Sequence, residues 1–190
     1  MKKLNCGCGN IPLEGYINMD KYYYPGCGSP NLNHKLAKSW KGEWIYGDVL
    51  DMNFKHNYFD KILFVHTLEH LSFEDGNRAL QNISRILKPG GVVEIEVPDL
   101  TKACKLFLET DPFVLGGDNR VWWRKIGLFH GTTGVDGEGQ FHLSNYTKNY
   151  LTKKMEEHGF INIEEILVGY GHGKPEPEYN FRLRGVRDDK

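Results

Sequence analysis

The sequence predicts an α/β fold in which helices sandwich a doubly wound, mostly parallel sheet. Three observations predict it. Short apolar segments alternate with amphipathic helical segments along the chain. Residues 61–65 are apolar on both sides, as in a parallel strand that is buried on both faces. Ser72, followed by an apolar stripe of 3.6-residue period, predicts a capped helix before the next strand.

Each element follows from its local pattern and its stop signal. The helix that begins after Ser72 should stop at Pro89–Gly91, and Gly159 should end the last helix. An arginine-bearing last strand reads as a solvated edge that discourages pairing, with Arg182, Arg184 and Arg187 on one side. The expected strands are 4–6, 16–20, 44–48, 61–65, 92–97, 160–168 and 180–186, and the other expected helices are 100–109 and 147–158.

Length and charge narrow the class of protein. The 190 residues suit a single domain, 1–190, with one core. The net charge is −1, so no overall basic field would attract nucleic acid, although a local basic patch stays open. The longest apolar run, 62–65, is too short to span a bilayer, and the opening MKKLNCGCGN lacks an apolar signal-peptide core. We therefore expect a cytoplasmic protein with no membrane partner, and we do not expect it to bind nucleic acid.

The cysteine pair near the start does not have the spacing of a metal site. Cys6 and Cys8 form C-x-C, whereas zinc sites usually space the first pair C-x2-4-C and supply a second pair. Disulfides are rare in the cytosol. The glycines between and after these cysteines, Gly7 and Gly9, are therefore the informative residues, because they let a ligand approach the backbone.

Polar residues follow successive strands, where ligands bind in open parallel sheets. After the second strand, Asp20 is placed to accept hydrogen bonds from ribose hydroxyls. After the third strand, Asp48 lies beside the apolar Val49 and Leu50, which suits an adenine edge and face. The sequence HTLEH, 66–70, follows the fourth strand. Together these features predict a pocket for a nucleoside-containing cofactor.

The chain resembles the class I S-adenosylmethionine-dependent methyltransferases, and among them the small type 11-like group. The resemblance covers about residues 3–168 and rests on LNCGCGN, YINMD, GDVLDMNFKHNYFDKI, VHTLEHL, ALQNISRILKPGGVVEIEVPDL and GQFHLSNYTKNYLTKKMEEHGF. It implies the Rossmann-like class I methyltransferase fold, the cofactor S-adenosyl-L-methionine, and methyl transfer to an oxygen, nitrogen or carbon atom.

One departure from the usual fold concerns the first helix. Residues 9–16 leave no room for the usual helix between the first two strands, so this helix should be missing or reduced to one turn. Backbone N–H groups of Cys8, Gly9 and Asn10 would then hold the cofactor carboxylate in its place. The shortening counts against a nicotinamide dinucleotide, whose pyrophosphate needs that helix terminus. The predicted cofactor-binding residues are Asn5, Cys6, Gly7, Cys8, Gly9, Asn10, Asp20, Lys21, Asp48, Val49, His66 and Thr67.

Candidate bases are histidines and a glutamate, and of these Glu69, His70 and His142 are predicted to be catalytic. His66 and His130 are further candidates. In the favoured interpretation His66 contacts the cofactor, Glu69 and His70 cap or line the pocket, and there is no metal site. The alternative is that His66 or Glu69 joins His70 and His142 around one divalent ion. Related methyltransferases of RNA ends and quinone precursors carry a similar E-x-x-E-H pattern with metal.

The resemblance implies a methyltransferase, and the preferred acceptor is a small molecule or a saccharide. The segment 110–145 would form a substrate-side insertion or lid. The segment 170–190 would be a C-terminal extension or the last strand. Two alternatives stay open: a metal-assisted RNA methyltransferase, which would need a basic face, and a non-catalytic nucleoside-binding or partner-binding protein on the same fold.

Overall fold

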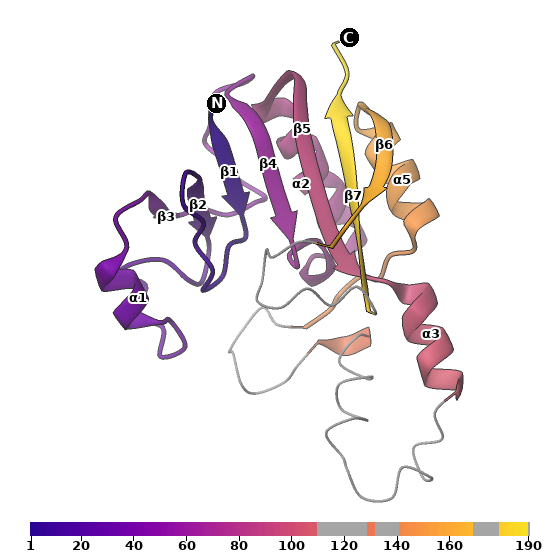
Figure 1. The fold of residues 1–190 in the computed structure, drawn as a ribbon, viewed down its shortest axis with the longest axis horizontal. Helices are drawn as coiled ribbons and strands as arrows, with labels where there is room; N and C mark the ends of the chain where they lie inside the picture. Colours follow the sequence, from indigo (N-terminus) through magenta and orange to yellow (C-terminus); the bar gives the residue numbers. More distant parts are fainter. Residues whose placement is uncertain (110–128, 132–140, 169–178, 190) are drawn as a thin grey trace, which may run out of the picture.

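A seven-stranded sheet with flanking helices forms the centre of the protein (Figure 1). The computed structural model describes residues 1–109, 129–131, 141–168 and 179–189. The strands are β1 (Lys3–Cys6), β2 (Ile17–Asp20), β3 (Trp44–Tyr46), β4 (Phe59–Val65), β5 (Leu87–Pro98), β6 (Phe160–Ile166) and β7 (Asn180–Arg187). The helices are α1 (His34–Ser39), the 3-10 turn η1 (Leu68–His70), α2 (Phe73–Ile86), α3 (Leu100–Glu109) and α5 (Lys148–Glu157).

The sheet order is β3-β2-β1-β4-β5-β7-β6. Neighbouring strands from β3 to β5 pair in parallel, and β7 is antiparallel to both β5 and β6. The predicted mostly parallel α/β fold is therefore confirmed. Because β1 lies between β2 and β4, the strand order reverses at β1 and β4, and ligands bind at the carboxyl ends of strands at such a point. In Figure 1 these ends lie away from both chain termini.

The predicted N-cap of α2 is confirmed, and α5 has an N-cap of the same kind that was not predicted. Ser72 Oγ accepts a hydrogen bond of 3.1 Å from the Asp75 amide, and Thr147 Oγ1 accepts one of 3.2 Å from the Tyr150 amide. The apolar face of α2 joins the core that includes Ile62 and Phe64 of β4. The predicted stop of α2 is displaced, because α2 ends at Ile86 and the turn-forming Pro-Gly-Gly lies within β5.

The opposite face of the sheet carries charged side chains that pair with one another. Alternate residues of a strand point to opposite faces, so Glu94 and Glu96 lie opposite the core residue Ile95. Arg182 Nη2 lies 2.6 Å from Glu96, and Arg184 Nη2 lies 3.0 Å from Glu94. The predicted solvated edge is wrong, because β7 lies inside the sheet between β5 and β6.

The helix between β1 and β2 is absent, as the spacing predicted, and side-chain amides organise the connection instead. Asn5 Nδ2 donates to the Ile11 carbonyl (3.0 Å) and to Asn18 Oδ1 (3.0 Å). Asn18 Oδ1 also accepts from the Leu13 amide (2.7 Å), while its Nδ2 donates to the Leu13 carbonyl (3.1 Å). The bonds from these two buried asparagines to Ile11 and Leu13 satisfy backbone groups that a helix would have paired internally.

The short helix α1 was not predicted. It begins after Asn33, whose side chain accepts from the Leu36 amide, and none of its residues is fully buried. Leu36 packs against a small second core made by Cys8, Tyr23, Leu32 and Trp44. This core holds the connection between β2 and β3 beside the glycine turn that follows β1.

Much of the predicted insertion falls outside the described residues. Residues 110–128 and 132–140 are among them, so the lid at 110–145 stays a prediction. The last strand, β7, lies within the segment 170–190. Within the described ranges, every helix falls short of the length and apolar character that crossing a bilayer would require.

Candidate active site

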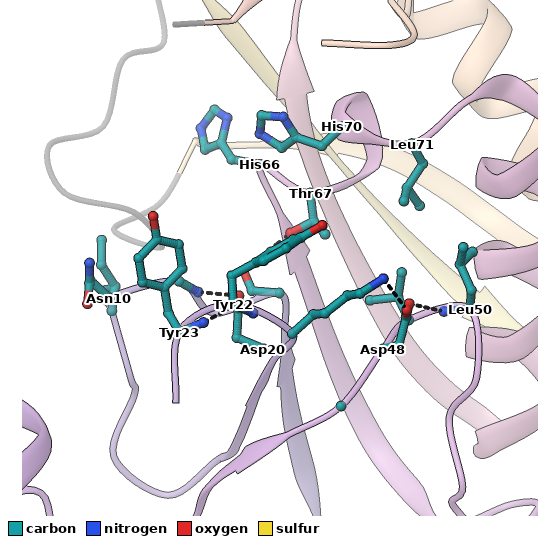
Figure 2. Close-up of a pocket in the computed structure, with 16 residues that line it drawn as sticks. Asn10, Asp20, Tyr22, Tyr23, Asp48, Leu50, His66, Thr67, His70 and Leu71 are labelled. Carbon is teal, nitrogen blue, oxygen red and sulfur yellow. Dashed lines mark hydrogen bonds and ion pairs between the residues drawn. The ribbon is translucent and has the colours of Figure 1, made fainter. Parts of the chain in front are cut away.

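A pocket of about 370 Å³ opens at the carboxyl ends of the parallel strands. Figure 2 shows Asp20 and Asp48 on one side of it and His66 and His70 on the other. The lining residues are Gly7, Gly9, Asn10, Ile11, Asp20, Lys21, Tyr22, Tyr23, Gly47, Asp48, Val49, Leu50, His66, Thr67, His70 and Leu71. The pocket thus draws on the segments that follow β1, β2, β3 and β4.

The turn after β1 requires glycine. Gly7 has φ of +70°, and a Cβ at this position would lie 2.1 Å from Thr67 Oγ1. Thr67 Oγ1 is within hydrogen-bonding distance of the carbonyl oxygens of Gly7 (3.2 Å) and Val65 (3.1 Å). The turn is therefore pressed against the end of β4, and its backbone borders the pocket.

Asp20 closes this turn from β2. Its Oδ2 accepts a hydrogen bond of 2.8 Å from the Gly9 amide, and its Oδ1 accepts from the amides of Tyr22 (2.8 Å) and Tyr23 (2.9 Å). Each carboxylate oxygen can accept more than one hydrogen bond, so Oδ2 keeps acceptor capacity. Asp20 is thus both a structural cap of the turn and a pocket-lining acceptor.

Part of the predicted carboxylate site is wrong. The Cys8 amide donates to the Met19 carbonyl (3.1 Å), and the Gly9 amide donates to Asp20. Neither N–H group is therefore available for a cofactor carboxylate. The side chain of Asn10 is also engaged, since it donates to the Asn31 carbonyl (2.8 Å) and accepts from the Asn33 amide (2.9 Å). Of the three backbone N–H groups predicted to hold the cofactor carboxylate, only that of Asn10 is still a candidate.

Three predicted cofactor-binding residues lie beneath the pocket instead of lining it. Asn5, Cys6 and Cys8 are buried and are not among the lining residues. Burial, followed by the nearby Asp20 carboxylate, raises the pKa of both thiols above the usual range. Both cysteines therefore stay protonated and pack as small apolar groups, which agrees with the expectation that neither is a nucleophile.

Asp48 and Lys21 form an ion pair at the pocket wall. Lys21 Nζ lies 2.7 Å from Asp48 Oδ2, and Asp48 Oδ1 accepts from the Leu50 amide (2.9 Å). Partial burial raises the pKa of Asp48, but the hydrogen bonds from Lys21 and Leu50 outweigh it and hold that pKa below its usual value. Asp48 is therefore ionised beside the apolar side chains of Val49 and Leu50, as the predicted adenine side requires.

His66 lies between two glutamates. Its Nδ1 is 3.1 Å from Glu69 Oε1, and its Nε2 is 3.2 Å from Glu96 Oε1. Burial lowers the pKa of His66, but these two hydrogen bonds raise it to about 10. Burial likewise raises the pKa of Glu69, yet the bond from His66 lowers it to about 2. An imidazolium carries a proton on both ring nitrogens and cannot accept another one. His66 is therefore excluded as the general base.

The structure brings the three predicted catalytic residues together. Ligand atoms of Glu69, His70 and His142 all lie within 4.8 Å of one another, and the two imidazole rings are 5.0 Å apart between centroids. His70 lines the pocket, whereas Glu69 and His142 are not among the lining residues. His130 is exposed and contributes its backbone carbonyl, which accepts from the His142 amide (3.1 Å).

Several lining residues were missed by the sequence analysis as site residues. Tyr22 and Tyr23 follow Asp20 directly in KYYYP, and their amides bind its carboxylate. That run of aromatic residues after the acid was the available signal. The others carry no distinctive pattern, and they are Ile11, Gly47 and Leu71.

Comparison with known proteins finds a family match for the N-terminal part of the chain. Residues 4–95 match the type 11 family model described as a methyltransferase domain. A tRNA (carboxymethyluridine(34)-5-O)-methyltransferase of Arabidopsis thaliana is 33% identical over 98 residues, which are 50% of this chain and 23% of that protein. An uncharacterised protein of Methanocaldococcus jannaschii is 32% identical over 94 residues, 50% of this chain and 39% of that protein. The matches thus span less than half the length of either curated relative.

Solved structures share the fold. An S-adenosylmethionine-dependent methyltransferase of Methanosarcina mazei superposes with a TM-score of 0.65 at 15% identity, covering 100% of this chain and 93% of that one. A protein of Pyrococcus horikoshii superposes with a TM-score of 0.62 at 15% identity, covering 98% of this chain and 82% of that one.

The pocket fits the cofactor that this family uses. Its volume of about 370 Å³ lies in the range of roughly 300–1,000 Å³ typical of small-molecule sites. It offers the carboxylates of Asp20 and Asp48 at successive strand ends, an apolar wall at Val49, and backbone exposed at Gly7. This donor set suits a ligand that joins a ribose and an adenine. The family match over residues 4–95, the shared fold and the pocket together support a class I S-adenosylmethionine-dependent methyltransferase of the type 11 group.

Proposed function

We propose that this protein transfers a methyl group from S-adenosylmethionine to a small-molecule or saccharide acceptor. The observation that carries the proposal is the division of the pocket in Figure 2. Asp20 and Asp48 lie on one side, and His70 lies on the other. Glu69 and His142 each place a ligand atom within 4.8 Å of one of His70. One side suits a nucleoside, and the other presents titratable groups to an acceptor.

The cofactor-binding residues follow from this division. Asp20 Oδ2 accepts from the ribose hydroxyls, and the amide of Asn10 binds the amino-acid end of the cofactor. Asp48 accepts from the adenine amino group, while Val49 contacts the ring. The bridge from Lys21 keeps Asp48 in place and ionised. Gly7 and Thr67 shape the wall between the two sides.

When bound, the cofactor supplies a sulfonium that makes its methyl group electrophilic. The residues of the chain orient the acceptor and accept its proton. His70 Nδ1 lies 3.0 Å from the Phe141 carbonyl oxygen, which can only accept, so Nδ1 carries the proton and Nε2 of the neutral ring carries the lone pair. The carboxylate of Glu69 stabilises positive charge on the neighbouring histidines. These three residues therefore form the acceptor side of the reaction.

The proposed acceptor class rests on the net charge of the chain and on the pairing of the positively charged groups that line the pocket. The net charge of −1 gives no overall attraction for a polyanion. Near the pocket, Lys21 is neutralised by Asp48, and His66 lies between Glu69 and Glu96. A neutral sugar or other hydroxylated small molecule meets no opposing field there. The Arabidopsis thaliana relative is named for tRNA, which makes tRNA the comparison that the experiment must include.

The experiment is a transfer assay with S-adenosylmethionine labelled in its methyl group. The purified chain is offered mono- and oligosaccharides, hydroxylated small molecules and unmodified tRNA in separate reactions. We expect label to enter a saccharide or small molecule, and His70→Asn to lose at least about 100-fold of that rate, within the range of general-base effects. The exposed His34→Asn in α1 is the matched control and should keep the wild-type rate. Label in tRNA alone would overturn the acceptor class, and label in no acceptor would favour a non-catalytic binding role.

A further inference from the structure

Glu69, His70 and His142 form a cluster that the methyltransferase fold by itself does not explain. We propose that these three residues bind a divalent transition-metal ion, of which Zn²⁺ is the reference case, on the acceptor side of the pocket. The metal site stands on its own geometry, and its role in activating an acceptor hydroxyl rests on the proposed function. The site has three parts: an unpaired carboxylate oxygen, ligand atoms that lie close to one another, and hydrogen bonds that hold the ligands in place.

The first part concerns the two oxygens of Glu69. Oε1 lies 3.1 Å from His66 Nδ1, whereas Oε2 is buried and has no hydrogen-bond partner among the described residues. Leaving a buried charged acceptor unsatisfied costs several kcal/mol, so such atoms are normally hydrogen-bonded or bound to metal. The imidazoles of His70 and His142 each place a ring nitrogen within 4.8 Å of a carboxylate oxygen of Glu69. A cation between them and Oε2 satisfies that oxygen.

The second part is the distance between the ligand atoms. One atom from each of Glu69, His70 and His142 lies within 4.8 Å of the others. Ligand atoms about 2.1 Å from a common tetrahedral ion are about 3.4 Å apart. A shift of up to about 0.8 Å per side chain, available by small χ rotations, therefore closes the site. His70 and His142 are both half-buried, which gives an ion a route of entry.

The third part is the support behind the ligands. Histidines that bind metal usually donate their other ring N–H to a carbonyl or carboxylate. His70 Nδ1 lies 3.0 Å from the Phe141 carbonyl, which leaves Nε2 for a metal. The amides of Leu143 and Ser144 both donate to the Glu69 carbonyl, at 2.8 and 3.2 Å. These bonds fix residues 141–144 against η1, and so hold His142 beside the other two ligands.

The ligand chemistry selects the class of ion. Two imidazoles and one carboxylate suit zinc and similar first-row ions, whereas magnesium and calcium prefer all-oxygen sites. Three protein ligands leave a coordination position open, as catalytic zinc sites do. Because His70 lines the pocket, that open position faces the space where an acceptor would lie. His66 does not take part, since both of its ring nitrogens lie against glutamate oxygens.

An ion bound by Glu69, His70 and His142 would activate a hydroxyl group of the methyl acceptor. An acceptor hydroxyl bound at the open position becomes more acidic, so its O–H bond breaks and the proton passes to water. The oxygen keeps the electron pair and uses it to form the bond to the methyl carbon. The S–CH3 bond breaks with its pair going to sulfur. With the ion bound, Nε2 of His70 is a metal ligand and no longer accepts the proton directly. The ion activates the hydroxyl instead.

The test reads metal binding without any methyl donor or acceptor. Tag-free protein is stripped with chelator, dialysed, and titrated with Co²⁺ by visible absorption and with Zn²⁺ by calorimetry, with Mg²⁺ as a comparison. We expect one ion per chain, ligand-field bands of Co²⁺ in a nitrogen and oxygen site, and no comparable binding of Mg²⁺. Glu69→Gln and His142→Asn should each weaken Zn²⁺ binding at least about tenfold, the lower bound seen even for groups that only support a ligand. His34→Asn should bind as the wild type does.

His142→Asn keeps the proposal falsifiable should Glu69→Gln fail to fold, because His142 is half-exposed and outside the main core. S-adenosylhomocysteine binding, measured on the same samples, reports the nucleoside side independently. Wild-type Zn²⁺ affinity in His142→Asn, or no stoichiometric binding to the wild type, overturns the metal site. If the wild-type protein binds Zn²⁺ but does not bind S-adenosylhomocysteine, the result counts against the proposed function and leaves the metal site standing.

Discussion

Thr67 Oγ1 lies 3.2 Å from the carbonyl oxygen of Gly7, and this contact joins the end of β4 to the turn after β1. The two residues are 60 positions apart in the sequence, yet they meet at the point where the strand order reverses. Their contact leaves no space for a side chain at Gly7. The wall between the two sides of the pocket therefore depends on one backbone geometry.

Replacing Gly7 should disrupt this wall. In Gly7→Ala the new Cβ would lie 2.1 Å from Thr67 Oγ1, and the backbone would keep a positive φ of +70°. We expect a loss of about 2–5 kcal/mol in unfolding free energy, from left-handed strain of about 1–2 kcal/mol and overpacking of about 1–3 kcal/mol. Affinity for S-adenosylhomocysteine should also fall. Urea unfolding and calorimetry measure the two effects.

Gly28→Ala separates the clash from the strain. Gly28 has nearly the same φ, +71°, but a Cβ there meets nothing within 4 Å. The unfolding free energy of Gly28→Ala should therefore fall only by the strain component, about 1–2 kcal/mol. Its affinity for S-adenosylhomocysteine should equal that of the wild type. Equal losses in the two variants would contradict the proposed contact between Gly7 and Thr67.

Asp20 should matter for affinity and for the order of the turn. Asp20→Ala removes the acceptor of three backbone N–H groups and the proposed acceptor of the ribose hydroxyls. We expect S-adenosylhomocysteine to bind at least about tenfold more weakly, equivalent to about 1.4 kcal/mol. The exposed Asp51→Ala, on the neighbouring turn, is the control and should bind as the wild type does. Undiminished affinity in folded Asp20→Ala would refute the assignment of the ribose site.

The pairing of Glu94 predicts an acid-sensitive component of stability. Burial raises the pKa of Glu94, but Lys61 and Arg184 outweigh it, so the folded pKa lies below the ordinary value of 4.5. A depressed folded pKa adds stability above the unfolded pKa, and this contribution is lost as pH falls through the folded pKa. Unfolding free energy should therefore drop below pH 4.5 in the wild type and change less over that range in Glu94→Gln. Glu14→Gln, at an exposed position, should follow the wild type.

Arg182 should be far more important to stability than Arg184. Arg182 is 7% exposed and lies 2.6 Å from Glu96, whereas Arg184 is 41% exposed. Arg182→Met leaves the buried Glu96 without that partner and should cost about 3–5 kcal/mol. Arg184→Met removes a solvent-screened pair and should cost at most about 1 kcal/mol. Chemical denaturation of the two variants side by side makes the comparison, and similar losses would show that the buried pair is not the stronger one.

The sequence predicted most of the helices and strands, but it did not predict where the last strand lies in the sheet. Ser72 and Thr147 cap α2 and α5 because capping is local: a side chain binds an amide three residues ahead. The position of β7 is not local. Its alternating arginines are compatible with an exposed edge, and only the pairing with β5 shows that Arg182 meets a buried glutamate.

In the candidate site, too, the local features were predicted correctly and the distant contacts were not. Residues at strand ends, such as Asp20, Asp48 and His66, reached the pocket because the topology of a parallel sheet brings strand ends together. Cys8 did not, because the side chain of a turn residue depends on packing, here against a small core with Trp44. Distant pairings were also beyond a local pattern, as with His66 and Glu96.

The most direct measurement is calorimetric titration of the purified chain with S-adenosylhomocysteine, with NADH as a parallel ligand. The account predicts micromolar binding of S-adenosylhomocysteine at one site per chain, weakened in Asp20→Ala, and no heat of binding from NADH. Binding of NADH in its place, or wild-type affinity for S-adenosylhomocysteine in Asp20→Ala, would contradict the pocket described here. Absence of binding by either ligand would contradict the cofactor assignment itself.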